Sequence, residues 1–283
     1  MRRAPIHVVI TGGTGGIGKA IASRFLREGA EVLVVARSAG ELEAIRQEFS
    51  TYGSALTTAM CDVSKAEEVR LLGEKIQERF GEKVDVLINA AGIYGPKDLL
   101  ENTDEEAWKE TLLVNLYGTM LMTRLVLPSM KKQKTGTIIN FSGGGEGAFP
   151  RFSAYAASKG GIIRFTESVA EEVRDFDICI NAIAPGAVNS GLLDEAIGAG
   201  PEKVGDATYL KLLTQKKEGG VSPDLAAELC VFLARDTSGV TGRVLSAVWD
   251  KQSSILKHSA EIMNTDIYTY RRIKPQDRGY DWK

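Results

Sequence analysis

The sequence contains little cysteine, and its few cysteines are scattered. Cys61, Cys179 and Cys230 lie far apart, lack the spacing of a metal site and are odd in number. We therefore expect reduced, buried thiols that pack as small apolar residues, and no bound metal. The lack of a disulfide framework favours a cytoplasmic location.

Net charge and long apolar runs are also lacking. The 35 Lys and Arg residues nearly balance the 37 Asp and Glu residues, and the formal net charge of −2 gives no support for nucleic acid as a partner. No run approaches the roughly 18 apolar residues of a membrane span, so we expect no membrane partner. The apolar stretch His7–Ile10 is too short for the hydrophobic region of a signal peptide.

What remains is an ordinary globular composition, 43% hydrophobic and 25% charged, without repeats or low-complexity segments. Short apolar segments alternate with amphipathic ones. Strands are expected at Ile6–Ile10, Glu31–Ala36, Ala55–Met60, Val84–Ile88, Thr137–Phe141, Ile178–Ile183 and Arg243–Val248. Helices are expected at Lys19–Glu28, Gly40–Phe49, Lys65–Phe80, Asp104–Met130, Ser153–Asp175 and Pro223–Ala234. This alternation predicts an α/β fold, a doubly wound parallel sheet of seven strands with helices on both faces.

Residues 1–250 are expected to form one domain. Between 191 and 220 the pattern loosens, with short helices expected at Leu192–Ile197 and Ala207–Lys217, and a segment of this kind is usually a lid over a binding site. Residues 251–283 are polar, and we expect this extension to pack on the body or on a neighbouring subunit.

A glycine-rich segment joins the first strand to the first helix. Glycine permits a tight turn and a close approach of backbone to ligand, and the helix N-terminus attracts a pyrophosphate. The segment therefore predicts a dinucleotide site, although a plain glycine-rich turn has the same composition. The cofactor-binding candidates here are Gly12, Thr14, Gly15, Gly16, Ile17 and Gly18.

The end of the second strand is where an adenosine ribose would be recognised. A site specific for NAD places a carboxylate here, whereas this chain has Ala36, Arg37 and Ser38. Arg37 can pair with a 2′-phosphate, so the sequence favours NADP(H), with NAD(H) possible if Arg37 is only a solvated loop charge.

Two further strand ends supply cofactor-binding candidates. Asp62, followed by Val63, could reach an adenine amino group or could equally cap the next helix together with Ser64. Small residues follow the fourth strand and allow backbone to lie near a cofactor; they are Asn89, Ala90, Ala91 and Gly92.

The candidate catalytic residues come from three segments. Tyr155 and Lys159 are four residues apart on an expected helix, so they share a face, as many solvated pairs do. A nearby ammonium would lower the tyrosine pKa from about 10 towards the range of acid/base catalysis. Ser142 ends a strand before three glycines that would leave room for a substrate, or forms an ordinary turn. Asn115 would either open its helix to a water relay or be a neutral surface residue.

Together these residues resemble the short-chain dehydrogenase/reductase family, in its single-domain branch, from about Ile6 to Asp250. The matching motifs are Thr11, Gly12, Gly16 and Gly18 of the cofactor loop, the segment Asn89–Gly92, the pair Pro185-Gly186, and the tetrad Asn115, Ser142, Tyr155 and Lys159. The resemblance implies a Rossmann-type fold, a homo-tetramer or homo-dimer, and cofactor contacts from Pro185, Gly186, Val188, Ser190, Tyr155 and Lys159.

The chain departs from the family pattern in three places. Gly143 follows Ser142 where a second serine is common, Asn189-Ser190 replaces a usual threonine, and Asp250-Lys251-Gln252 replaces a usual Asp-Gly-Gly. These changes bear on substrate closure and subunit contacts more than on the chemistry.

The resemblance implies hydride transfer between the nicotinamide of NADP(H) and a carbonyl or secondary alcohol substrate. Ser142 would bind the substrate oxygen and Tyr155 would act as general acid or base. Lys159 would lower the tyrosine pKa and hold the nicotinamide ribose, while Asn115 would position a water. The alternatives are an NAD-dependent dehydrogenase, a non-redox isomerase or elimination enzyme acting on a sugar or acyl substrate, and a non-catalytic dinucleotide sensor. A 3-oxoacyl thioester, a sugar and a small secondary metabolite all remain open as substrates.

Overall fold

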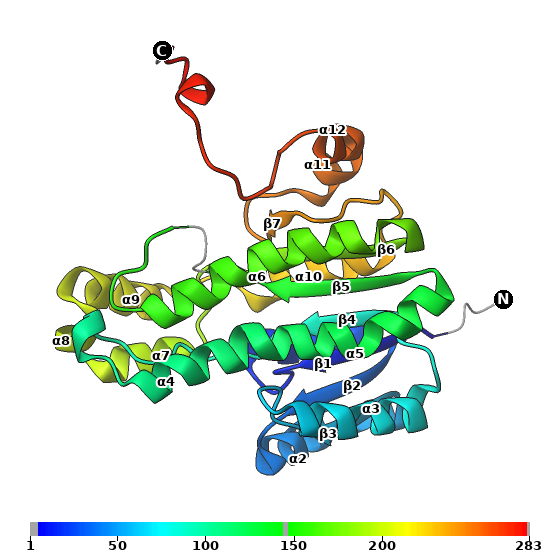
Figure 1. Cartoon of the computed structure of the whole chain (residues 1–283). Helices are drawn as coiled ribbons and strands as arrows, with labels where there is room; N and C mark the ends of the chain where they lie inside the picture. The colour runs from blue at the N-terminus through cyan, green and yellow to red at the C-terminus, as the bar shows by residue number, and fades with distance from the viewer. Residues whose placement is uncertain (1–4, 144–146, 282–283) are drawn as a thin grey trace.

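The computed structural model describes residues 5–143 and 147–281. Its centre is one parallel sheet with strand order β3-β2-β1-β4-β5-β6-β7 (Figure 1). The strands are β1 His7–Thr11, β2 Glu31–Ala36, β3 Leu56–Met60, β4 Val86–Asn89, β5 Gly136–Phe141, β6 Ile178–Ala184 and β7 Val244–Ser246. The order reverses between β1 and β4, which confirms the predicted doubly wound, Rossmann-type sheet of seven strands.

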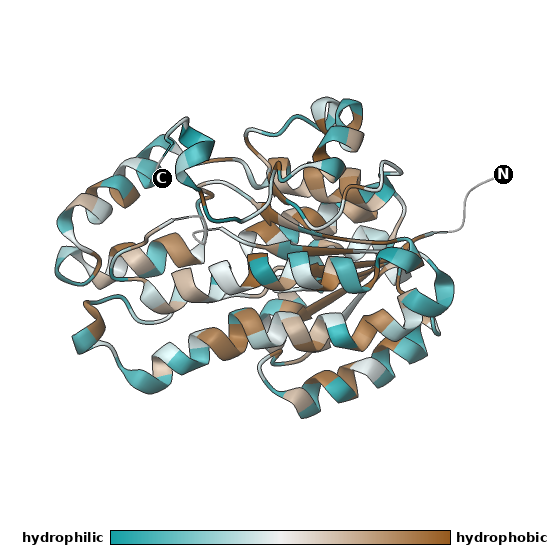
Figure 2. Ribbon diagram, turned by 45° about the horizontal axis from the view of Figure 1, so that its top comes forward, coloured by the Kyte–Doolittle hydropathy of each residue, from teal (hydrophilic) through white to brown (hydrophobic). Residues whose placement is uncertain are grey.

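Helices cover both faces of the sheet. They are α1 Gly16–Arg27, α2 Ala39–Glu48, α3 Ala66–Phe80, α4 Glu105–Leu112, α5 Gly118–Gln133, α6 Ser153–Glu172, α7 Gly191–Ala199, α8 Pro201–Val204, α9 Asp206–Glu218, α10 Pro223–Arg235, α11 Gln252–Lys257 and α12 Ser259–Asn264. One core lies between the sheet and α1, α2 and α10, and a second lies between the sheet and α3, α5 and α6. Figure 2 shows brown strands in the middle of the molecule, between helices that carry both teal and brown residues.

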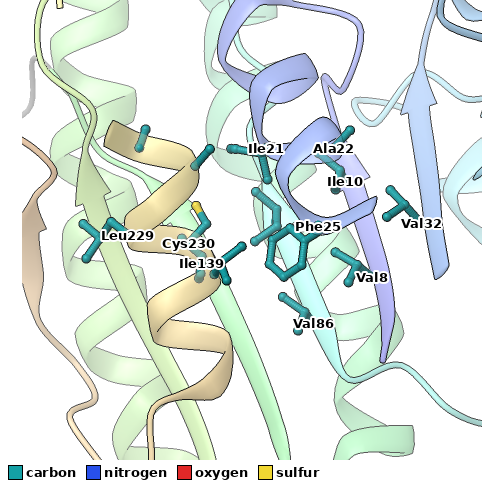
Figure 3. Close-up of a cluster of buried hydrophobic side chains, with 14 of the residues drawn as sticks. Val8, Ile10, Ile21, Ala22, Phe25, Val32, Val86, Ile139, Leu229 and Cys230 are labelled. Atoms are coloured by element: carbon teal, nitrogen blue, oxygen red, sulfur yellow. The ribbon is translucent and has the colours of Figure 1, made fainter. Parts of the chain in front are cut away.

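The alternation of side chains along each strand produces these two cores. In β1, Val8 and Ile10 point to the α1 side, where they meet Phe25, and Val9 points to the other side (Figure 3). The side chains of Val8, Val9 and Ile10 are all fully buried. Strands that are buried on both faces need a continuous run of apolar residues, and such runs made the strands recognisable in the sequence.

Two segments are more regular than the sequence indicated. Residues 191–220 form the helices α7, α8 and α9, where α8 was not predicted. After β7 the chain forms α11 and α12, also not predicted, and their Ile255 and Ile262 are buried in the core on the α10 side. Beyond α12 the last residues project from the body (Figure 1).

One helical stretch is unusually long and apolar. Glu105–Gln133, which includes α4 and α5, has an 18-residue window with a mean hydropathy of 1.2, enough by length and composition to cross a membrane. Half of that window is buried inside the protein. A core helix meets the same criterion, and α5 packs on β4 and β5.

Candidate active site

The glycine loop between β1 and α1 is packed too closely for side chains at two positions. Gly12 has a φ of +64°, and a methyl group there would lie 2.7 Å from the Ala91 Cα atom. A methyl group at Gly18 would lie 2.2 Å from the Gly12 carbonyl oxygen. Within the described chain, the first turn of α1 holds no acidic residue and Gly15 offers no side-chain cap. The first N–H groups of this helix are therefore suited to an anionic ligand.

A cleft of about 540 Å³ opens above this loop. Many predicted cofactor residues line it: Gly12, Thr14, Gly15, Gly16, Ile17, Gly18, Arg37, Ser38, Val63, Ala90, Ala91, Gly92 and Ser190. The size of the cleft, its close-packed glycines and the open helix N-terminus fit a nicotinamide dinucleotide.

The cleft lining also contains residues that the sequence did not single out. They are Val35, Ala36, Glu41, Cys61, Ile93, Val114, Gly191 and Leu192. Most of them directly adjoin a predicted residue, so the strand ends did carry a signal. Glu41 is further from any predicted residue, because it lies in the first turn of α2 and reaches the cleft only once the chain is folded.

Some predicted cofactor residues are not part of this lining. The carboxylate of Asp62 accepts hydrogen bonds from the Ser64 backbone N–H at 3.0 Å and from its hydroxyl at 2.7 Å, so it shapes the turn before α3. Burial raises the pKa of Asp62, but these bonds and the charge of Arg37 lower it by more. Asn89 is buried and donates to the Asn140 side chain at 2.9 Å.

The Pro185-Gly186 segment borders the catalytic side of the site. Pro185 lies beside Gly143, since a methyl group at Gly143 would be 3.6 Å from its Cδ atom. Gly186 has a φ of +83° and is covered by Val248. Val188 is buried, and neither it nor this Pro-Gly pair is part of the cleft lining.

Helix α6 carries Tyr155 and Lys159. The Lys159 Nζ atom donates to the Phe141 carbonyl oxygen at 2.8 Å and lies 5.5 Å from the centre of the Tyr155 ring. A methyl group at Gly143 would lie 3.7 Å from the Tyr155 hydroxyl oxygen, which places this hydroxyl at the end of β5. The side chains of Tyr155 and Lys159 therefore point into the protein, at the edge of the sheet where the strands end.

The expected shift of the tyrosine pKa is not found. Burial, with a smaller effect of Tyr94, raises the pKa of Tyr155 above its ordinary value. Burial also lowers the pKa of Lys159 to about 8. The expectation was wrong because the site removes water from both groups, which penalises the phenolate and the ammonium alike.

Ser142 follows β5 and is fully buried. Its backbone N–H donates to the Ile183 carbonyl oxygen at 2.9 Å. Its hydroxyl has no hydrogen-bond partner among the described residues. A buried hydroxyl without a partner is uncommon and requires a physical explanation. Gly144 and Gly145, expected to leave room for a substrate, lie outside the described residues.

Asn115 lies in a π-helical turn, Leu113–Tyr117, between α4 and α5. It is fully buried, so the surface interpretation is wrong. Its Oδ1 atom accepts from the Ile93 N–H at 2.9 Å, and its Nδ2 atom donates to the Ile93 carbonyl at 3.0 Å and to the Ser158 hydroxyl at 2.9 Å. The distortion of the helix was expected, and π-turns of this kind occur often at functional sites.

Asn115 and Lys159 meet at Gly92. A methyl group at Gly92 would lie 3.3 Å from the Asn115 Oδ1 atom and 3.6 Å from the Lys159 Nζ atom. Ser158, which was not a predicted site residue, links Asn115 to the helix that carries Tyr155, because its hydroxyl accepts from Asn115 and donates to the Tyr155 carbonyl at 2.7 Å. Hydrogen bonds therefore join two tetrad members, Asn115 and Tyr155, while Lys159 is held separately by the Phe141 carbonyl.

An aromatic cluster surrounds Tyr155. Tyr94 stands edge-on to it at 4.7 Å between ring centres, and Phe149 and Phe152 stack on each other at 4.2 Å beside it. No sequence pattern pointed to these residues, because they come from different loops and the start of α6.

Comparison with known proteins identifies the family of this chain. A family model described as short chain dehydrogenase matches residues 6–198. The chain belongs to the short-chain dehydrogenase/reductase family.

Relatives within this family cover most of the chain. It is 34% identical over 239 residues to 3-oxoacyl-[acyl-carrier-protein] reductase FabG of Thermotoga maritima, with 84% of this chain and 94% of that relative covered. A crystal structure of NAD⁺-bound xylitol dehydrogenase has a TM-score of 0.77 and 27% identity, covering 85% of this chain and 96% of that one. The structure of ElxO with NADP bound has a TM-score of 0.73 and 30% identity, covering 86% and 97%.

This short-chain dehydrogenase/reductase is therefore an oxidoreductase that depends on a nicotinamide dinucleotide. Its cleft above the glycine loop is where the dinucleotide would bind, and the residues of that cleft fit the group.

Proposed function

We propose that this enzyme interconverts a carbonyl compound and a secondary alcohol, with Tyr155 as general acid or base. The bound cofactor supplies or accepts the hydride at the substrate carbon. In reduction the Tyr155 hydroxyl gives its proton to the substrate oxygen, and in oxidation the proton returns. The Tyr155 hydroxyl is protonated at neutral pH, as a donor in reduction must be, although the burial that raises its pKa makes it a weaker acid than an exposed tyrosine.

The observation that carries this proposal is the unpartnered hydroxyl of Ser142 at the end of β5. Tyr155 approaches the next residue, Gly143, from α6. A substrate oxygen bound between the two hydroxyls would satisfy Ser142 and lie within reach of the tyrosine proton.

The other tetrad residues support this arrangement. We propose that Lys159 turns from Phe141 towards the cofactor ribose and the tyrosine when ligands bind. Both N–H groups of the Asn115 amide are used by Ile93 and Ser158, so its side chain positions these two residues. Its Oδ1 atom accepts one hydrogen bond, from Ile93, and can accept a second from the water of the proposed relay.

We propose that residues 191–220 close the substrate side as a lid on a catalytic domain that ends near residue 250. Leu193, Ala196, Val204 and Leu212 pack around Phe152, next to Tyr155. Lys97 pairs with Glu195 on α7, and Asp98 pairs with Lys203 on α8. These contacts join the lid to the loop after β4.

We propose NADP(H) as the preferred cofactor. Arg37 lines the cleft beyond β2, at the place of the adenosine ribose. Its guanidinium is half exposed and reaches Glu110 only at 3.9 Å, so it is available to a 2′-phosphate. Relatives of known structure carry either cofactor, so the preference depends on this local charge.

We also propose a cytosolic location, on the basis of three unpaired thiols, of which Cys61 and Cys230 are buried.

The substitution Tyr155→Phe tests the proposal. Two probe reactions cover both directions: reduction of an acetoacetyl thioester with NADPH and oxidation of xylitol with NADP⁺ or NAD⁺. In whichever reaction the wild type supports, kcat should fall by at least about 10²–10⁴. NADPH affinity, measured by fluorescence titration, should be retained.

Tyr52→Phe is the matched control, since Tyr52 packs against Phe49 away from the site. An unchanged kcat in Tyr155→Phe would contradict the assignment. If the wild type bound neither NADPH nor NADH, the cofactor site itself would be wrong.

A further inference from the structure

Two opposite charges face the cofactor cleft. Among the residues that the structure describes around it, Arg37 and Glu41 are the charged ones. They lie four positions apart, Arg37 just after β2 and Glu41 in the first turn of α2. Both therefore belong to the end of the cleft that would receive the adenosine ribose.

Glu41 is exposed, but its side chain is tied to the cleft wall. Its Oε2 atom accepts a hydrogen bond from the Thr14 hydroxyl at 2.8 Å, across to the glycine loop. Its backbone N–H donates to the Ser38 hydroxyl at 3.2 Å, which caps α2. The carboxylate thus bridges the two segments between which the nucleotide must lie.

The positive charge of Arg37 is opposed from several sides. The Glu110 carboxylate lies 3.9 Å from its guanidinium. Asp62 also feels this guanidinium, whose charge helps to lower the pKa of that carboxyl. Glu41, unlike these two acidic groups, lines the cleft.

We propose that Glu41 is a specificity-determining residue that weakens the binding of NADP(H) relative to NAD(H). This rests on the proposed cofactor site. A 2′-phosphate carries about two negative charges at neutral pH, and a fixed carboxylate nearby repels it. A 2′-hydroxyl carries no charge and can donate a hydrogen bond to the same carboxylate. The preference for NADP(H) over NAD(H) that Arg37 produces is therefore smaller than it would be without Glu41.

The substitution Glu41→Gln tests this inference with binding as the readout. It removes the charge and keeps an oxygen that can accept from Thr14. NADPH and NADH dissociation constants are measured by fluorescence titration for the wild type and each variant. We expect NADPH to bind about 5-fold more tightly in Glu41→Gln, the effect of one unit charge a few ångströms away, with NADH changed less than 2-fold.

Glu43→Gln is the matched control. It makes the same charge change on the same helix, but Glu43 pairs with Arg46 outside the cleft. It should leave the ratio of the two dissociation constants unchanged. The gain in Glu41→Gln should also shrink at high salt, where charge interactions are screened.

A third variant separates charge from loop structure. Thr14→Val removes the hydrogen bond and leaves the carboxylate, so it should not favour NADPH over NADH. Equal changes for both cofactors in Glu41→Gln would mean that Glu41 only supports the glycine loop, and would overturn the inference. Weaker NADPH binding in Glu41→Gln, with NADH binding unchanged, would overturn it as well. Wild-type protein that binds neither cofactor would refute the proposed function instead.

Discussion

At the scale of single residues, burial decides how the site is charged. Tyr155 and Lys159 were identifiable from their spacing, because four residues on a helix bring two side chains to one face. Their titration was not predictable, because it depends on the depth of the site and on the Phe141 carbonyl that receives the ammonium. Ser158 was missed for the same reason, since its role depends on contacts with Asn115 from another helix.

Lys159 should make stability depend on pH in the alkaline range. Its pKa in the folded protein is about 8 against an ordinary value of 10.5. Between these values the unfolded chain keeps the proton that the folded chain has released, so this group adds stability as pH rises. Below pH 8 the buried ammonium lowers the free energy of unfolding by an amount that no longer changes with pH.

Lys159→Met should remove that dependence. Between pH 7 and 10, the free energy of unfolding of the wild type should rise by about 2–3 kcal/mol relative to that of the variant. This follows from the difference of 10.5 − 8 = 2.5 between the two pKa values of Lys159. Urea unfolding at several pH values, without cofactor, measures the difference. Lys109→Met, at an exposed lysine, is the control. Parallel curves for the wild type and Lys159→Met would show that the ammonium is not buried as described.

At the scale of elements, the glycine loop was predictable because its constraint is local. The crowded atoms around Gly18 are those of Gly12 and Gly13 in the same turn. The helices α11 and α12 were not, because they are short and depend on distant contacts. The guanidinium of Arg243 donates to the carbonyl oxygens of Ile262 at 2.8 Å and Thr265 at 3.2 Å, at the end of α12.

The two glycines Gly18 and Gly15 should respond differently to alanine. A methyl group at Gly18 meets backbone atoms at 2.2 Å, whereas one at Gly15 meets its nearest atom at 3.5 Å. Gly18→Ala should therefore lower the free energy of unfolding by about 1–3 kcal/mol or more. Gly15→Ala should stay within about 0.5 kcal/mol of the wild type. Urea unfolding without cofactor measures both, and equal effects would contradict the close packing of the loop.

At the scale of the whole molecule, the sheet topology predicts the position of the candidate site but not the surface through which subunits would contact one another. The site forms where β1, β2, β4 and β5 end, as the sequence indicated. The role of the outer face of α5 and α6 could not be predicted in this way, because the role of a helix surface depends on what packs against it. A groove of about 830 Å³ runs between these helices and includes Met120, Leu127 and Phe165.

We propose that a second copy of this chain covers that groove, giving the homo-oligomer that the family resemblance implied. The rim carries Arg124, Lys131 and Arg164 together with Glu172, so two copies related by a two-fold axis could pair opposite charges around the apolar centre. Apolar area of this kind on a helix pair commonly marks an interface.

Leu127→Arg should disrupt this assembly, because it places an unpaired charge at the centre of the self-contacting face. Sedimentation velocity should show the wild type as a dimer or tetramer and the variant as a smaller species with an unchanged far-ultraviolet circular dichroism spectrum. Leu213→Arg makes the same change at an exposed leucine on α9 and should leave the oligomer intact. A wild type that sediments as a monomer, or a variant that keeps its size, would mean that the groove between α5 and α6 is not the contact between copies.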